Sequence, residues 1–226
     1  MMNLKKVAFS IVAILMLAGF TAQTQAQGVS FGLRAGFDMQ NLNGKDFDGD
    51  ALELDLVPRF NAGLFAEIPV APDFYFQPAL LFSTKGAKST NEFLGLDTEI
   101  DFNLGYIELP LSLLYKPILG NGRFMLGFGP YLGYGITGKA KYTLNNTSTD
   151  ADIDWNNEYE ADGSIAQFKP FDFGANVFFG YELAMGLSFQ LNTQLGLVNI
   201  NPDSSGDDGD TSVKNTGFGI SLGYRF

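Results

Sequence analysis

Hydrophobic and polar residues alternate along most of the chain after residue 28, a pattern typical of two-faced β-strands. In the first such segment, residues 29–40, Phe31 and Leu33 lie on one face while Arg34 and Asp38 lie on the other. No window shows helical spacing over a comparable length, and after residue 28 no apolar run approaches the roughly 20 residues of a membrane-spanning helix. The alternation predicts strands in eight segments: 29–40, 59–68, 74–85, 102–116, 124–137, 171–182, 187–197 and 217–226.

The connections between these segments alternate between short and long. The short ones cover residues 69–73, 117–123 and 182–186. The long ones are rich in Asp, Asn, Gly, Ser and Thr and cover residues 41–55, 86–101, 138–168 and 199–214. Short turns at one end and long loops at the other are typical of an antiparallel up-and-down transmembrane barrel, with the turns in the periplasm.

The two faces of the predicted strands differ in a way that favours a membrane barrel over a soluble fold. Any one alternating segment is equally typical of a soluble β-sandwich. Taken together, however, the apolar face is too large and too aromatic for water. The opposite face is too polar and too rich in glycine for a hydrophobic core. We therefore expect the apolar face to meet lipid and the polar face to line the lumen.

Ionisable residues on the polar face form two sets of equal number and opposite charge. Balanced charges in a narrow lumen can neutralise one another, whereas in an apolar ligand cavity their desolvation would be costly. The predicted lumen charge network comprises Arg34, Asp38, Arg59, Glu67, Lys85, Glu108, Lys116, Asp172, Glu182 and Arg225.

A membrane sheet must close, because each unpaired backbone group in hydrocarbon costs several kcal/mol. The last strand should therefore pair with the first. Bacterial barrels use even strand numbers, so eight strands are expected and ten remain open. Side chains mostly fill an eight-stranded barrel. Aromatic residues are expected at the periplasmic lipid headgroups, namely Phe31, Phe74, Tyr115, Phe124, Tyr181, Tyr224 and Phe226.

The first residues are expected to direct export. Lys5 and Lys6 precede a continuous apolar stretch over residues 7–20, which is too short for a typical spanning helix. Small residues then occur at Thr24 and Ala26. These features predict a cleaved signal peptide over residues 1–26 and a barrel domain over residues 27–226.

Composition excludes several classes of function. The 226-residue chain contains no Cys and no His, which excludes thiolate nucleophiles, imidazole bases and the usual zinc sites. Its net charge of −11, without a cluster of Lys and Arg, argues against nucleic-acid binding. We expect no enzymatic activity and no cofactor.

The final strand, which alternates Phe218, Ile220, Leu222, Tyr224 and Phe226 with small residues, resembles the closing strand and assembly signal of outer-membrane barrels. The runs at 76–86 and 106–116 resemble the porin-family "outer membrane beta-barrel domain" group, sometimes called PorT-like. The resemblance covers essentially the whole mature chain and implies insertion by the barrel assembly machinery. It implies no catalytic residues.

Two functions remain open from the sequence. The first is a structural and interaction role in the Gram-negative outer membrane, with a largely occluded lumen. The protein is then expected to be a monomer that contacts membrane lipid, lipopolysaccharide and an unidentified external partner. Lys139, Lys141 and Thr143 alternate with apolar residues, so the strands at 124–137 and 171–182 are expected to extend beyond the membrane as a protruding hairpin with an exposed edge. The second is a narrow channel for ions or small solutes, suggested by the many lumen glycines.

Two further motifs carry less weight. Asp46, Asp48 and Asp50 resemble the start of a calcium loop, and so do Asp150, Asp152 and Asp154, but neither set has the Gly and Glu that complete an EF-hand. A solvated acidic loop is the better interpretation. Gly127 and Gly129 resemble part of a nucleotide loop, yet the strand continues through them, so a small-residue stripe facing the lumen is favoured.

Overall fold

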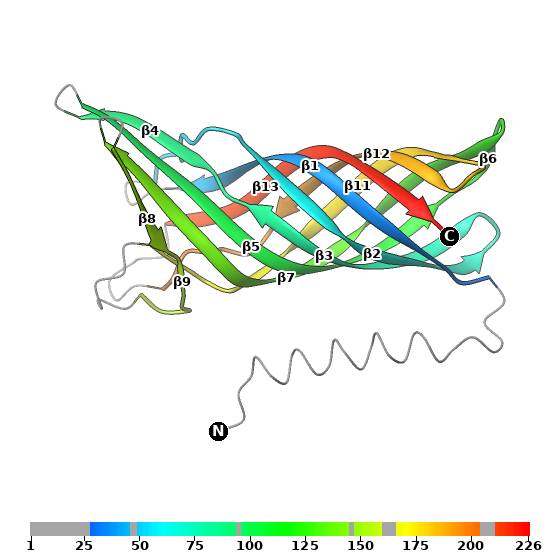
Figure 1. Ribbon diagram of the computed structural model, residues 1–226. Coiled ribbons are helices and arrows are strands. Elements are labelled where there is room, and N and C mark those ends of the chain that lie inside the picture. The colour runs from blue at the N-terminus through cyan, green and yellow to red at the C-terminus, as the bar shows by residue number, and fades with distance from the viewer. Residues whose placement is uncertain (1–27, 46–48, 94–95, 145–146, 160–165, 204–210) are drawn as a thin grey trace.

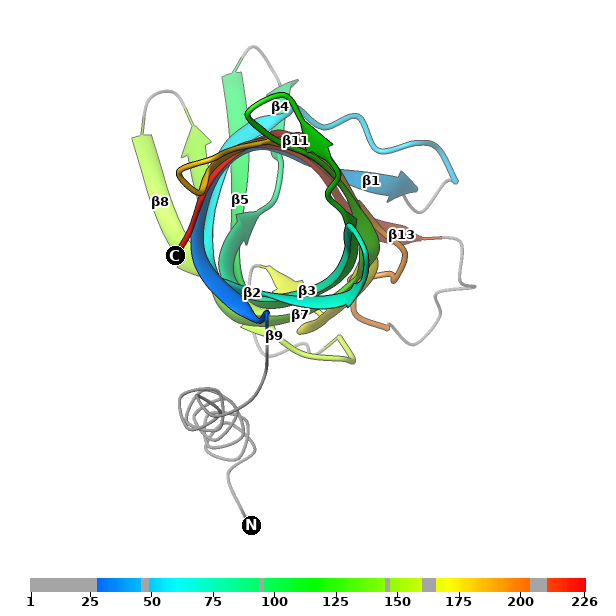
Figure 2. The same cartoon turned by 90° about the vertical axis from the view of Figure 1, so that its right-hand side faces the viewer.

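Eight antiparallel strands form a closed ring around one axis (Figures 1 and 2). The computed structural model describes residues 28–45, 49–93, 96–144, 147–159, 166–203 and 211–226. In ring order the strands are β1 (Ser30–Lys45), β2 (Val57–Ala71), β3 (Phe74–Lys85), β5 (Leu96–Tyr115), β7 (Gly122–Leu144), β11 (Phe171–Leu183), β12 (Leu187–Gly196) and β13 (Ser212–Arg225).

The ring closes between the first and last strands. β1 pairs with β2 on one edge and with β13 on the other, in continuous register from Gly32↔Arg225 to Lys45↔Ser212. β5 and β7 pair across the opposite wall, with one shift in register between Gly105 and Tyr106. The predicted eight-stranded barrel is therefore confirmed. Among the described residues, no helix has the length and apolar character needed to cross a membrane. The predicted signal peptide lies outside the described residues and stays a prediction.

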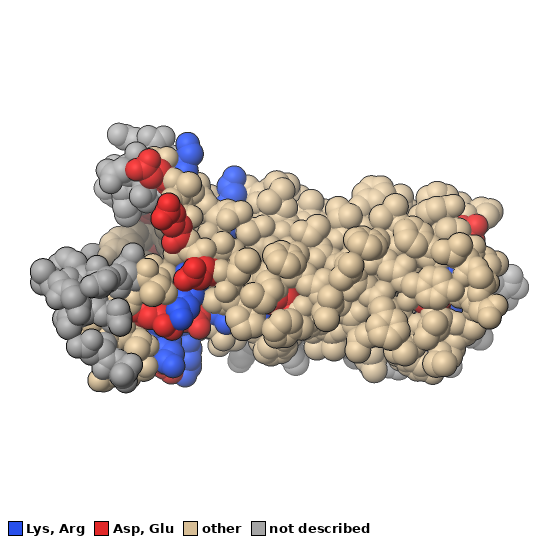
Figure 3. Space-filling model, turned by 90° about the horizontal axis from the view of Figure 1, so that it is seen from above, with Lys and Arg blue, Asp and Glu red and all other residues tan. Residues whose placement is uncertain are grey.

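The outward face of the barrel is apolar, as the alternation predicts. Phe37, Phe60, Phe128 and Ile220 are each more than half exposed. Figure 3 shows that this surface carries very little charge over most of the length of the barrel, and that charged side chains gather mainly at one end. The exposed apolar band is what a lipid-facing wall requires.

The strands extend further at the charged end than the sequence predicts. β7 continues to Leu144, as the alternation at Lys139, Lys141 and Thr143 predicts, but the predicted hairpin partner is wrong: the extension pairs with β5, which begins at Leu96, and not with β11. β4 (Lys88–Phe93) pairs with β5, and β8 (Thr147–Asp152) pairs with β7. These four strands form a sheet beyond the lipid band, at the left in Figure 1. We call this sheet, with the loops packed on it, the headpiece.

A bulge in β7 separates the barrel wall from the headpiece. Gly135 pairs with Tyr106 and Thr137 pairs with Gly105, which leaves Ile136 as the extra residue. Because one inserted residue reverses the side-chain alternation, Lys139 and Lys141 point outward while Ala140 is fully buried. Three short strands complete the structure: β6 (Ile118–Leu119) in a turn, and β9 (Asp154–Trp155) with β10 (Gln167–Phe168) in the headpiece.

Candidate functional site

The inward face of β5 passes through every layer of the lumen in turn. Leu104 and Tyr106 lie at the outer mouth, Glu108 and Ser112 follow, and Leu114 lies near the opposite end. All five are at most 1% exposed. The buried side chains of the lumen therefore lie in successive layers. The order of the inward residues along β5 is the order of these layers.

A hydrophobic cluster fills the outer mouth, and we call it the outer cap. Its fully buried members come from five separate regions of the chain and include Leu42, Leu104, Tyr106 and Ile200. Backbone hydrogen bonds hold the loops in place, since Ile200 N donates to Val213 O at 2.8 Å. The buried residues of the outer cap are Leu42, Ala87, Leu104, Tyr106, Ala140, Ile153, Ala166, Phe168 and Ile200.

Aromatic rings tie the outer cap to the headpiece. Trp155, the only tryptophan in the chain, contacts Tyr106 edge to face, with ring centroids 5.4 Å apart. Phe102 and Phe168 make a similar contact at 5.6 Å. The polar loops were expected to be solvated, so this cluster is a feature that the sequence interpretation missed.

Directly below the cap lies the upper ion cluster, formed by Lys85, Glu108 and Asp172. Lys85 Nζ is 2.5 Å from a Glu108 oxygen and 3.0 Å from Asp172 Oδ2, and all three side chains are at most 1% exposed. The Tyr131 ring lies under the ammonium at 4.1 Å. Asn215 Nδ2 donates to the same Asp172 oxygen at 2.9 Å. One cation therefore joins β3, β5 and β11 across the lumen.

The middle of the lumen mixes polar and apolar groups. Asp38 accepts hydrogen bonds from Asn61 and Asn192, and Arg34 faces the same region. Among the described residues neither Asp38 nor Arg34 has an ion pair within 4.0 Å. Two small apolar clusters also face inward, which the sequence interpretation did not anticipate: Phe65 with Ala79 and Leu81, and Leu114 with Met125 and Phe178.

The inner ion cluster lies at the end with the short turns and comprises Glu67, Lys116, Glu182 and Arg225. Lys116 Nζ lies 2.7 Å from Glu67 Oε2 and 2.6 Å from Glu182 Oε2. Arg225 Nη2 lies 2.7 Å from Glu182 Oε1. Because these residues come from β2, β11, β13 and the end of β5, the cluster bridges the barrel from wall to wall.

Glycines on the lumen face lie opposite large side chains on neighbouring strands. Gly127 pairs in register with Phe178, and a Cβ at Gly127 would lie 2.2 Å from the end of that ring. Gly32 has the same relation to Phe65. Each of these two glycines makes room for the ring that faces it.

The remaining predicted charged residue, Arg59, lies at the outer mouth, where it pairs with Asp101 instead of with the deeper clusters. On the outward face of the headpiece, Lys88 pairs with Glu99 at 2.6 Å. The hydrogen bond to Glu99 raises the pKa of the Lys88 ammonium above its ordinary value.

The predicted acidic loops do not form a metal site in the described part of the chain. Asp150 and Asp152 lie on β8, and Asp150 is 3.9 Å from Lys139. No group of three or more potential metal ligands occurs among the described residues. Asp46 and Asp48 lie outside them.

A closed antiparallel ring with an apolar exterior and a polar, ion-paired interior defines an outer-membrane β-barrel. Residues 21–201 match the family described as "Outer membrane protein beta-barrel domain", and the chain belongs to that family. It is an outer-membrane protein of the Gram-negative type, as the sequence resemblance implied. The narrower PorT-like name stays a prediction.

Several solved outer-membrane proteins are similar in structure at low sequence identity. They include a major outer membrane protein from Thermus thermophilus (14% identity, 88% of this chain and 100% of that chain, TM-score 0.45). Neisserial surface protein A is 13% identical over 88% of this chain and 100% of that chain, with a TM-score of 0.43. Ail of Yersinia pestis, in complex with a heparin analogue, is 14% identical over 88% and 99%, with a TM-score of 0.42. No curated protein matches the chain.

Proposed function

We propose that this protein is a non-enzymatic outer-membrane barrel with an occluded lumen, which holds its headpiece outside the membrane for contact with an external partner. The observation that carries the proposal is the outer cap. Leu104, Tyr106 and Ile200 are completely buried at the mouth through which a solute would enter.

Occlusion does not depend on the cap alone. Below it, Lys85 and Lys116 each bridge two carboxylates across the lumen. Separating either cation from its carboxylates would leave buried charges unpaired, which is costly, so these bridges hold the opposite walls of the lumen together. The Phe178 ring fills the space beside Gly127 between them. These three features favour a closed scaffold and argue against a narrow channel.

The headpiece supports the interaction role. The strand register aligns one row of alternating charge across it: Lys88 on β4, Asp101 on β5, Lys141 on β7 and Asp150 on β8. In the described part of the chain, β8 pairs only with β7, so its other edge is available for strand addition. A packed surface outside the lipid band is suited to recognition.

Planar-bilayer conductance tests the occluded lumen. The purified folded protein should give no reproducible current steps. Glu108→Lys should lower stability without creating selective conductance, because it places a second cation beside Lys85. Reproducible steps in the wild type, with an ion selectivity that Glu108→Lys alters, would instead establish the channel.

A further inference from the structure

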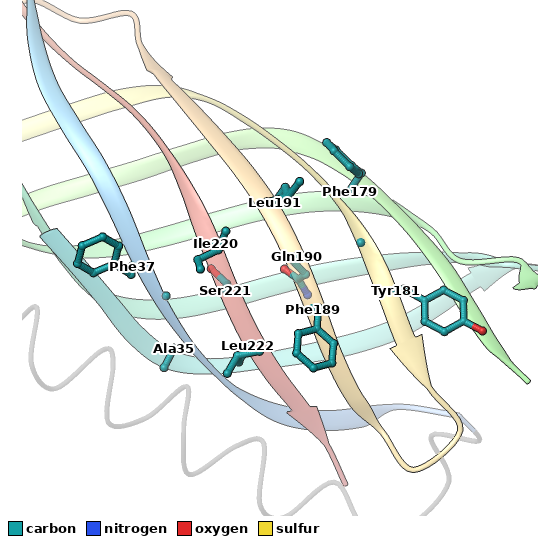
Figure 4. Close-up of a pocket in the computed structure, with 12 residues that line it drawn as sticks. Ala35, Phe37, Phe179, Tyr181, Phe189, Gln190, Leu191, Ile220, Ser221 and Leu222 are labelled. Atoms are coloured by element: carbon teal, nitrogen blue, oxygen red, sulfur yellow. The ribbon is translucent and has the colours of Figure 1, made fainter. Parts of the chain in front are cut away.

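The lipid-facing wall contains a hollow that the closed-barrel role does not explain. It crosses β1, β13, β12 and β11 and has a volume of about 650 Å³ (Figure 4). A smaller hollow adjoins it over β2, β1 and β13 and also includes Ala35. Both lie on the outward face, not in the lumen.

Two parallel rows of outward side chains form the walls of the larger hollow. The strand register aligns Phe37 with Ile220, then Leu191 and Phe179, in one row. The second row lies two residues further along each strand, on the same face. It consists of Ala35, Leu222, Phe189 and Tyr181, which the register also aligns. The hollow is therefore a trough that runs across four strands.

The trough is uncharged and floored by backbone. Gly36 and Gly180 lie between the rows, and the side chains of Gln190 and Ser221 are nearly buried on the other side of the wall. Ala35 is the one small side chain in the two rows. Because its methyl group projects so little, the trough is open at the β1 end.

The other end of the trough reaches the barrel rim that carries the short turns. The Tyr181 hydroxyl donates to Leu119 O, in the β5–β7 turn, at 2.7 Å. In Figure 4, Tyr181 lies toward the β11–β12 turn and Phe37 lies at the opposite side of the view. A chain lying in the trough would thus start at the periplasmic headgroup level and run toward the middle of the membrane.

We propose that the trough binds one acyl chain of a phospholipid from the periplasmic leaflet. Its lining is hydrocarbon-like and offers no charged partner to a polar ligand. A flexible acyl chain can follow the curved wall of the barrel. A second copy of the barrel would meet that wall along a line of contact, whereas stable protein interfaces bury about 1,200 Å² or more. The Tyr181 end of the trough lies at the rim that carries the short turns, and this position assigns the lipid to the periplasmic leaflet.

Native mass spectrometry of the detergent-purified full-length protein, with added phosphatidylethanolamine as the probe, tests this proposal. The wild type should retain one phospholipid after detergent exchange. Ala35→Phe, which places a ring in the trough, should lower the retained fraction several-fold. Ala175→Phe is the matched control, because Ala175 is exposed on the same lipid-facing band outside the trough, and it should retain lipid like the wild type.

Folding of each variant is checked by the shift in gel mobility on boiling, and Ala35→Leu replaces Ala35→Phe if the larger side chain prevents folding. Equal retention by a folded Ala35 variant and the wild type would overturn the proposal. So would preferential retention of lipopolysaccharide over phospholipid, or a dimer that Ala35→Phe dissociates. These outcomes are independent of whether the lumen conducts.

Discussion

Inside the barrel, large side chains and glycines occupy facing positions on neighbouring strands. Tyr131 lies opposite Gly174, and Asp38 lies opposite Gly219. A Cβ at either glycine would lie within 3.0 Å of the facing side chain. Such pairing of large with small side chains fills a narrow barrel without strain. At these positions glycine is needed for packing, not for backbone freedom.

Gly135→Ala should disturb the outer cap. The added methyl would lie 2.4 Å from Cζ3 of Trp155, so the indole must move, at a cost of about 1–3 kcal/mol. Because Trp155 is the only tryptophan, its fluorescence should shift toward longer wavelength as it becomes more exposed. Gly133→Ala is the control on the same face of β7, since its nearest neighbour is 3.3 Å away. An unchanged Gly135→Ala spectrum would argue against a packed cap.

Lys116→Met should destabilise the barrel strongly. It removes the cation shared by Glu67 and Glu182. Glu67 then keeps a hydrogen bond from Gln77 at 3.2 Å, and its nearest cation is Arg225, whose Nε is 3.7 Å away. Loss of one partner from a buried ion pair costs about 3–5 kcal/mol. Urea unfolding in lipid vesicles measures the change. Lys139→Met, which removes an exposed lysine, should cost less than about 1 kcal/mol. Equal effects for both variants would contradict the role of the inner ion cluster.

At the scale of elements, β7 has two segments with opposite side-chain alternation. Before the bulge, Leu132 and Tyr134 face lipid, and after it Lys139 and Lys141 face outward while Ala140 packs into the cap. The extra residue, Ile136, therefore allows one strand to serve both the membrane wall and the headpiece.

Deletion of Ile136 should unfold the headpiece and leave the barrel intact. Without the extra residue, Lys139 and Lys141 would point into the outer cap, where a buried unpaired charge costs several kcal/mol. Trypsin should then cut the headpiece of the folded protein much faster than in the wild type. Ile136→Ala keeps the residue count and should show wild-type digestion. Slow cleavage of the deletion variant would show that the bulge does not set the alternation.

Alternation was sufficient to predict the eight barrel strands, because period two is a local property of the chain. It could not locate the bulge, since nothing in the run Tyr134 to Thr137 marks which residue lacks a partner. It also missed the outer cap, whose members Ile153 and Ile200 are isolated apolar residues in polar loops. Those residues are a usable signal, but their meeting point depends on long-range pairing that a local pattern does not contain.

At the scale of the whole molecule, the two ends of the barrel differ. The headpiece end carries most of the surface charge, whereas the turn end exposes Val70, Ile118, Leu119 and Met185. In the proposed function, the outer cap and the inner ion cluster close the two ends of the lumen. A small polar reagent outside the cell should therefore reach the headpiece and have no route through the protein to the turns.

Single cysteines test both the orientation and the closed lumen, because the natural chain has none and each variant carries one thiol. Lys139 has a side chain that is 63% exposed on the headpiece, and Met185 is 69% exposed in the β11–β12 turn. On intact cells a membrane-impermeant maleimide should label Lys139→Cys fully and Met185→Cys hardly at all. After the outer membrane is permeabilised, both thiols should react at similar rates, which shows that the Met185→Cys thiol is itself accessible. Rapid labelling of Met185→Cys on intact cells would contradict the expected orientation or the closed lumen. If Lys139→Cys were then unlabelled, the turns would face outward. If Lys139→Cys were labelled as well, the reagent would have passed through the lumen.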